Sequence, residues 1–103
     1  MKVEIRAAGL GLPPAAKRAI SRHAYFELSR FADRLSRITI QLSQDVTPPA
    51  DLDKACRVSV DWPLLGRIEA ETRHSDPVQA ACVGVSRVRQ RLFCRLKIAN
   101  QRR

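Results

Sequence analysis

The 103-residue sequence lacks any apolar stretch approaching the roughly 20 residues that a membrane-spanning helix requires. Its first residues, "MKVEIRAAGL", alternate polar and apolar side chains and so lack the continuous apolar segment of a signal peptide. These two absences predict a cytosolic protein.

Cysteine is scarce: the sequence has three, Cys56, Cys82 and Cys94, and no CxxC pair. Cys82 and Cys94 are expected on one helix, where a separation of twelve residues corresponds to about 18 Å of rise, beyond the reach of a disulfide. We therefore expect reduced thiols in a reducing compartment.

Residues typical of catalytic and metal centres are also few. His23 and His74 are the two histidines, and neither an HxxxH motif nor a glycine-rich phosphate loop accompanies them. A metal site built from Cys56, His74 and Cys82 remains a minor alternative. We predict no catalytic residue, no metal and no cofactor, and hence a protein that is not an enzyme and has no small-molecule substrate.

Positive charge, in contrast, is abundant. Lys and Arg number 19 against 10 Asp and Glu, which gives a net charge of +9 and a pI near 10.8. Such a chain needs an acidic partner, and nucleic acid fits best because each bound phosphate releases counterions. An anionic membrane surface could use the same charge, but we predict nucleic acid as the partner and no membrane.

Hydrophobic periodicity divides the chain into six regular segments. Apolar residues alternate with polar ones in four of them, the pattern of half-buried strands, and recur every three to four residues in two, the pattern of amphipathic helices. The expected order is a strand at 2–6, a helix from 13 or 14 to about 32, strands at 37–43, 55–62 and 67–72, and a helix from 77 onward, with a proline-rich acidic loop at 44–53.

This order predicts an α+β fold with β-α-β-β-β-α topology. The last three strands have short links and should form an antiparallel meander, so that two helices cover one face of a four-stranded sheet. No linker, repeat or low-complexity segment interrupts the sequence, and we expect a single domain over residues 1–103.

The final helix should begin at Pro77, with Asp76 or Ser75 accepting from its free amides. Its apolar stripe is expected to contain Val78, Cys82, Val85, Leu92 and Leu96, with Val88 at the edge. Arg89 projects close to this stripe, so that it must snorkel, meet an acid or mark a slightly different packing face.

A second stripe on the same helix is basic and contains Arg87, Arg91 and Arg95, one helical turn apart. A charged helix face is often merely solvated, but such faces usually mix both signs, and no acid follows Asp76. Arginine offers a planar fork of donors for phosphate. The charge pattern therefore indicates an RNA-binding set on both helices, consisting of Arg18, Arg22, Arg30, Arg87, Arg91, Arg95 and Lys97.

Three aromatic residues leave alternatives open. Tyr25 and Phe26 point away from the expected core and could stack on a base or ribose, although helix packing is an equal alternative. Trp62, in the turn "WPLLG", either caps the open end of the core or forms a contact with another protein.

Three stretches in this order resemble the ribosome hibernation promoting factor family, also described as the ribosome-associated inhibitor or sigma-54 modulation family. They are "MKVEIRAAGLGLPPA", "LSRFADRLSRITIQLS" and "SDPVQAACVGVSRVRQRL", and the likeness covers nearly the whole chain. Within the last stretch, the positions that match the family pattern are Asp76, Pro77, Ala80, Arg87 and residues 90–92. Val78 stands where the family usually has an aromatic residue, and Gly84 lies inside the helix at a cost of about 1 kcal/mol.

The resemblance implies a fold similar to double-stranded RNA-binding domains and a function in bacterial stress and stationary phase. Such proteins bind the small ribosomal subunit and its rRNA, occupy the channel used by mRNA and tRNA, and silence idle ribosomes. By motif position the resemblance points to Arg22, Arg87, Arg91 and Arg95 as rRNA contacts. It also implies the short branch of the family, without a second domain, and we expect the isolated protein to be monomeric.

A protein-interaction module on the same fold is the alternative function. Its contact surface would be Trp62 to Leu65 together with an edge strand, and its charge would be incidental. Salt separates the two hypotheses, because RNA binding weakens steeply with ionic strength and an apolar contact does not.

Overall fold

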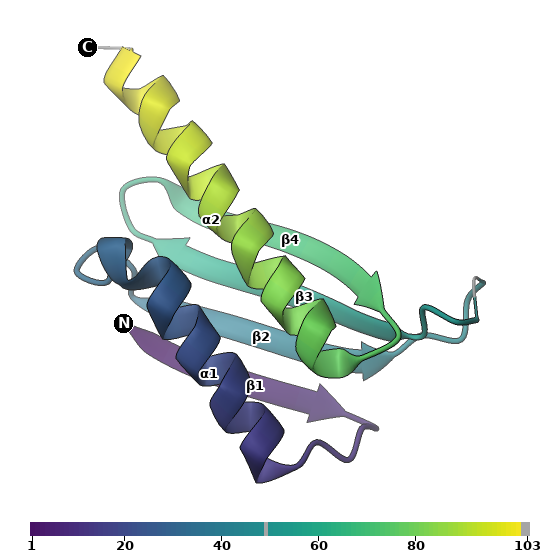
Figure 1. The fold of residues 1–103 in the computed structure, drawn as a ribbon. Helices are drawn as coiled ribbons and strands as arrows, with labels where there is room; N and C mark the ends of the chain where they lie inside the picture. Colours follow the sequence, from purple (N-terminus) through teal and green to yellow (C-terminus); the bar gives the residue numbers. More distant parts are fainter. Residues whose placement is uncertain (49, 102–103) are drawn as a thin grey trace.

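The computed structural model describes residues 1–48 and 50–101, with side chains described as far as residue 98. The elements are β1 (Lys2–Ala8), α1 (Pro14–Leu28), a short 3-10 helix η1 (Ser29–Phe31), β2 (Arg37–Gln44), β3 (Lys54–Trp62), β4 (Gly66–His74) and α2 (Pro77–Gln101). This order confirms the predicted β-α-β-β-β-α topology and the α+β fold (Figure 1).

The four strands form one sheet in the order β1-β2-β3-β4. β2, β3 and β4 pair antiparallel, which confirms the predicted meander. β1 pairs parallel with β2 because α1 carries the chain back across the sheet between them. Both helices lie side by side on one face of the sheet (Figure 1). The strand order leaves β1 and β4 as its two edges.

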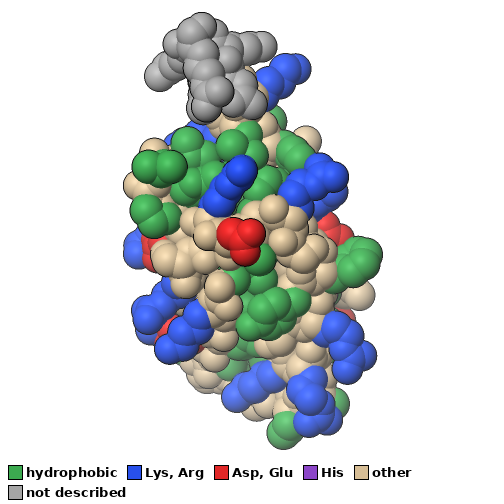
Figure 2. Space-filling model, turned by 90° about the vertical axis from the view of Figure 1, so that its left-hand side faces the viewer, with side chains coloured by type: hydrophobic (Ala, Val, Ile, Leu, Met, Phe, Trp, Pro, Cys, Tyr) green, Lys and Arg blue, Asp and Glu red, His purple; other side chains and the backbone are tan. Residues whose placement is uncertain are grey.

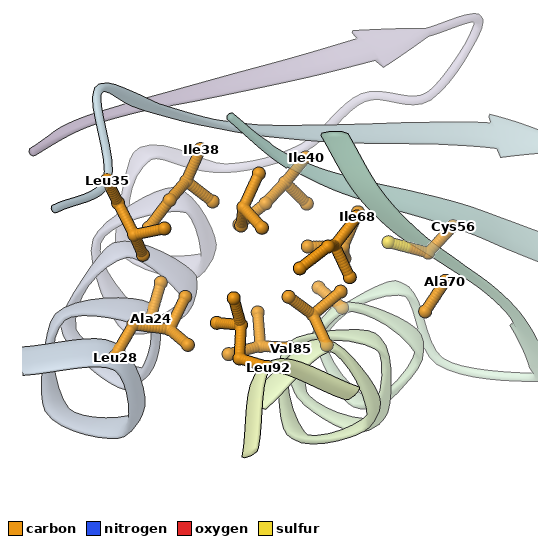
Figure 3. Close-up of a cluster of buried hydrophobic side chains, with 14 of the residues drawn as sticks. Ala24, Leu28, Leu35, Ile38, Ile40, Cys56, Ile68, Ala70, Val85 and Leu92 are labelled. Carbon is orange, nitrogen blue, oxygen red and sulfur yellow. The ribbon is translucent and has the colours of Figure 1, made fainter. Parts of the chain in front are cut away.

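Alternation along the strands separates a buried face from an open one. Side chains from β2, β3 and β4 that face the helices are buried, among them Ile38, Ile40, Val58, Val60 and Ile68, and Figure 3 shows Ile38, Ile40 and Ile68 directed into the same cluster as helix residues. The open face carries cross-strand ion pairs that follow the register, such as Arg57 with Glu71 at 2.6 Å. This face therefore mixes both signs of charge.

Small differences from the predicted boundaries have local causes. β1 extends to Ala8 because Ala7 and Ala8 pair with Leu42 and Ser43 of β2. The first helix ends at Leu28 and tightens into η1, where Phe31 is still buried. These residues lengthen the strand and shorten the helix without changing the order of elements.

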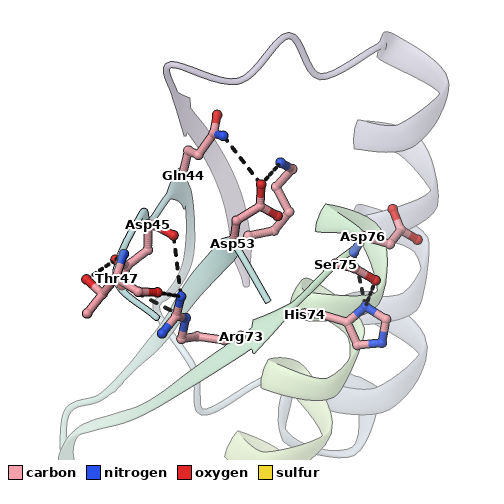
Figure 4. Close-up of polar contacts among 9 residues, drawn as sticks. Gln44, Asp45, Thr47, Asp53, Arg73, His74, Ser75 and Asp76 are labelled. Carbon is pink, nitrogen blue, oxygen red and sulfur yellow. Dashed lines mark hydrogen bonds and ion pairs between the residues drawn. The ribbon is translucent and has the colours of Figure 1, made fainter. Parts of the chain in front are cut away.

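The start of α2 agrees with the sequence. Pro77 is its first residue, and the Val78 amide donates to Asp76 Oδ1 at 3.4 Å. The Asp76 amide in turn donates to His74 Nδ1 at 3.1 Å, a contact visible in Figure 4. Thr72 is buried, and its hydroxyl donates to the Ala80 carbonyl at 2.7 Å, which ties the first turns of α2 to β4.

The packing face of α2 is rotated from the predicted stripe. Val88, expected at the edge, is fully buried, whereas Cys82, expected within the stripe, is half-buried. Ala81, Val85 and Val88 now define the face together with Leu92, which Figure 3 shows beside Val85. The rotation follows from close contact between α2 and β3 at Gly84.

The loop between β2 and β3 is held by one arginine of β4. Arg73 donates to the Asp45 carbonyl at 3.3 Å and to the Thr47 carbonyl at 2.6 Å, and Figure 4 shows its guanidinium directed at both residues. The hydroxyl and amide of Thr47, and then Arg73, lower the pKa of the Asp45 carboxyl. Asp45 and Thr47 are therefore held by contacts from β4 and by hydrogen bonds between themselves.

Candidate nucleic-acid interface

Arg87, Arg91 and Arg95 lie on the side of α2 that faces β4, and all three are exposed. Their Nη1 atoms donate to backbone carbonyls of that strand and the turn before it: Arg87 to Glu71 at 3.2 Å, Arg91 to Glu69, and Arg95 to Leu65 at 3.2 Å. We call these three residues the arginine row. Their guanidinium groups are held along the edge of β4 and do not simply extend into solvent.

The row fits the strand because the two elements advance at similar rates. Four residues of α-helix rise about 6 Å, and two residues of strand rise about 6.8 Å. Moving from Arg87 to Arg91 therefore matches moving from Glu71 to Glu69 in the opposite direction along β4. The i, i+4 spacing in the sequence thus becomes a regular line of cations beside an edge strand.

Arg30 lies elsewhere, at the seam between the two helices. Its Cζ atom is 5.4 Å from the centre of the Phe93 ring, and Arg89 approaches the same ring at 5.1 Å. Arg89 Nε is also 3.5 Å from Glu27 of α1. Arg89 therefore meets an acid, one of the three outcomes that the sequence allowed, and it remains exposed at the seam with α1, outside the rotated packing face.

Arg18 and Arg22 are exposed on α1, and Lys97 is exposed near the end of the described side chains of α2. The seven predicted residues thus fall in separate places on the helical layer: Arg18 and Arg22 on α1, Arg30 at the helix seam, the arginine row on the β4 side of α2, and Lys97 farther along α2. Figure 2, which views the molecule from the left of Figure 1, shows Lys and Arg side chains scattered over that side, with hydrophobic and other side chains between them and few acids. The basic surface is broad and extends beyond a single stripe.

Two aromatic residues add apolar surface between these cations. Phe26 is 78% exposed and Tyr25 is 48% exposed, which contradicts a helix-packing role for Phe26. Phe26 follows Arg22 by one helical turn on α1. An exposed ring beside an exposed arginine can stack on an unpaired base.

Trp62 caps the core; it does not form an exposed contact surface, the other role that the sequence left open. It is 4% exposed, and its ring centre is 5.9 Å from that of Phe31. Arg34 covers it, with Cζ 5.7 Å from the ring centre. Because Trp62 is buried, the alternative protein-contact surface lacks its largest member and keeps Leu64, which is 90% exposed in the turn that follows.

Two of the three cysteines are shielded from solvent: Cys56 is buried and Cys82 is half-buried, whereas Cys94 is exposed. Burial raises the pKa of Cys56 to about 12, and burial likewise raises the pKa of Cys82. Across residues 1–48 and 50–101, no group of three or more His, Cys, Asp and Glu side chains could hold a metal ion. The helices in these ranges are not long and apolar enough to cross a membrane.

A surface pocket on the open face of the sheet reaches Arg87 of the arginine row. Its volume is about 500 Å³, and Gln41, Arg57, Glu71 and Arg73 are among the residues that line it. Because Arg57 already pairs with Glu71 there, the pocket mixes both signs of charge and lacks the uniform charge that a phosphate ligand requires.

Solved structures of other proteins share this fold, and two of them illustrate the likeness. A ribosomal subunit interface protein from Coxiella burnetii matches with a TM-score of 0.71 and 19% identity, over 90% of this chain and 94% of that chain. The N-terminal domain of Protein Y from Thermus thermophilus matches with a TM-score of 0.68 and 19% identity, over 88% and 94%. No family model and no curated protein matches the sequence.

At this level of identity the likeness establishes the fold, an α+β sheet with two helices on one face. The two matches agree with the fold that the resemblance to the hibernation promoting factor family implied.

Proposed function

We propose that this protein binds the small ribosomal subunit through rRNA and inhibits translation by occupying the channel of mRNA and tRNA in idle ribosomes. The observation that carries the proposal is the arginine row, a line of exposed cations spaced one helical turn apart. The sequence of α2 contains no Asp or Glu to balance them. The fold shared with a protein that is named as a ribosomal subunit interface protein supports it.

The row suits phosphate for a physical reason. A guanidinium has five N–H donors in a fixed fork, and the bonds to β4 engage Nη1. Nε and Nη2 can therefore still donate to phosphate oxygens. Because the β4 carbonyls already orient each side chain, less rotamer entropy is lost on binding than for a free arginine.

The α1 residues would widen the contact to a second part of the RNA. Arg18 and Arg22 supply further charge, and Phe26 supplies a stacking surface for an unpaired base. Inhibition in this proposal is steric and needs no reacting group: the protein fills a site that substrates of translation must enter.

Co-sedimentation with small ribosomal subunits tests the proposal. Five or six phosphate contacts, at a slope of about 0.7 to 0.9 per contact, should weaken binding by roughly 10² to 10³ between about 50 and 200 mM salt. Binding that does not change with salt would contradict it, and so would failure to inhibit translation at saturating protein.

A further inference from the structure

The arginine row has a second consequence, which concerns the strand beside it. β4 is an edge of the sheet, and its nine residues, Gly66–His74, have one neighbouring strand, β3. An edge strand presents backbone N–H and C=O groups that another strand can pair with. We propose that the arginine row closes this edge against pairing with a second copy of the chain.

The hydrogen bonds identify which backbone groups are at stake. In an antiparallel ladder, the N–H and C=O of one residue point to the same side. Since the Glu69 and Glu71 carbonyls accept from Arg91 and Arg87, the amides of Glu69 and Glu71 also face away from β3. These are the groups through which a further strand would add, and the row occupies their acceptors.

The strand is suited to pairing with itself. A two-fold antiparallel pair centred on Glu69 would set Arg67 of each copy opposite Glu71 of the other, while Ile68 would face Ala70 on the core side. Two attractive Arg67–Glu71 pairs would then form for one repulsive contact between the two Glu69 side chains. A second copy is therefore the occupant that the edge fits.

The row opposes this pairing in two ways. A second strand must first displace three donors from the carbonyls of Glu71, Glu69 and Leu65. It would also bring two arginine rows face to face across the new interface, where like charges repel. Both effects disappear when the guanidinium groups are removed.

Two triple variants with equal loss of charge test the inference. Arg87→Ala/Arg91→Ala/Arg95→Ala removes the row, and Lys17→Ala/Arg18→Ala/Arg22→Ala removes three exposed cations from α1. Light scattering after size exclusion, without RNA or ribosomes, should show the first rising with concentration toward twice the 11.6 kDa monomer mass. The second should remain monomeric. Equal behaviour of the two variants would overturn the inference.

A rescue variant ties any dimer to β4. Glu71→Pro, added to the row variant, removes an edge amide at a position where an edge strand tolerates proline, and should restore the monomer. Persistence of the dimer would overturn strand pairing.

A single variant covers the case in which circular dichroism shows that the triple variant does not fold. In Arg91→Ala, protection of the Glu69 and Glu71 amides from hydrogen exchange must increase with protein concentration. Protection that stays constant would overturn the inference. Because RNA is absent throughout, the outcome does not depend on the proposed function.

Discussion

Gly84 of α2 lies directly over Val58 of β3, and a Cβ added at Gly84 would stand 2.8 Å from Val58 Cγ2. Real Cβ atoms do not approach a neighbour this closely, so only glycine permits the observed distance between helix and sheet. The glycine costs about 1 kcal/mol of helix propensity. In return, Val85 and Val88 reach the core and Thr72 can donate to Ala80.

Gly84→Ala should therefore destabilise the protein by roughly 1 to 3 kcal/mol, the usual cost of overpacking a core, although alanine is the better helix former. Val58 is β-branched and fully buried, so it cannot move aside cheaply. Urea unfolding measures the effect. In the double variant Gly84→Ala/Val58→Ala, the destabilisation should be smaller than the sum of the two single effects; strict additivity, or a more stable Gly84→Ala, would contradict the contact.

Arg18→Glu/Arg22→Glu is expected to weaken binding to small subunits and to lower the salt slope by about 0.7 to 0.9 for each phosphate that is no longer bound. Within the described ranges neither arginine side chain forms a hydrogen bond or ion pair with the rest of the chain. The free energy of unfolding should thus change by less than about 0.5 kcal/mol. This pair separates binding from folding better than the arginine row, whose bonds to β4 would also be broken.

The matched control for this test is Lys2→Glu/Arg6→Glu, which changes the net charge equally on β1, with both side chains exposed. It should bind nearly as the unmodified protein does. Equal weakening by both double variants would mean that overall charge, and not the helical layer, determines the affinity.

Phe26→Ala should reduce RNA affinity by roughly 5- to 100-fold if the ring stacks on a base, since stacking contributes about 1 to 3 kcal/mol per base. Its ring is 78% exposed, so the melting temperature should hardly change. Phe26→Tyr keeps an aromatic face and should bind normally. Full RNA affinity in Phe26→Ala would show that the Phe26 ring is not part of the interface.

Alkylation should distinguish the cysteines. Cys94 is exposed and should react readily, whereas Cys56 is buried, with its pKa raised to about 12 by loss of solvation. Below the ordinary thiol pKa of 9.0 the Cys56 thiol keeps its proton in both the folded and the unfolded chain, and its contribution to stability is fully present. As pH rises from 9.0 toward 12 the unfolded chain loses this proton first, so the free energy of unfolding falls. Mass spectrometry after brief iodoacetamide treatment at about pH 8 should find Cys56 unmodified until the chain unfolds; early modification would contradict its burial.

Much of the fold follows from local pattern. Alternation around Ile38 and Val58 determines strands, and the three- to four-residue spacing from Ile20 to Leu28 determines α1. Proline at the first position marks both helix starts, Pro14 and Pro77. These signals are readable because each depends on residues that are neighbours in the chain.

The sequence by itself determined the order of the elements, the sheet's two faces and the uniform positive charge of α2. Only the tertiary structure decided the rotation of α2 at Gly84 and the position of its arginine row against β4. Both depend on which strand lies beneath the helix and how closely it approaches. Periodicity along one helix contains no information about that neighbour, because the contacts join residues far apart in the chain.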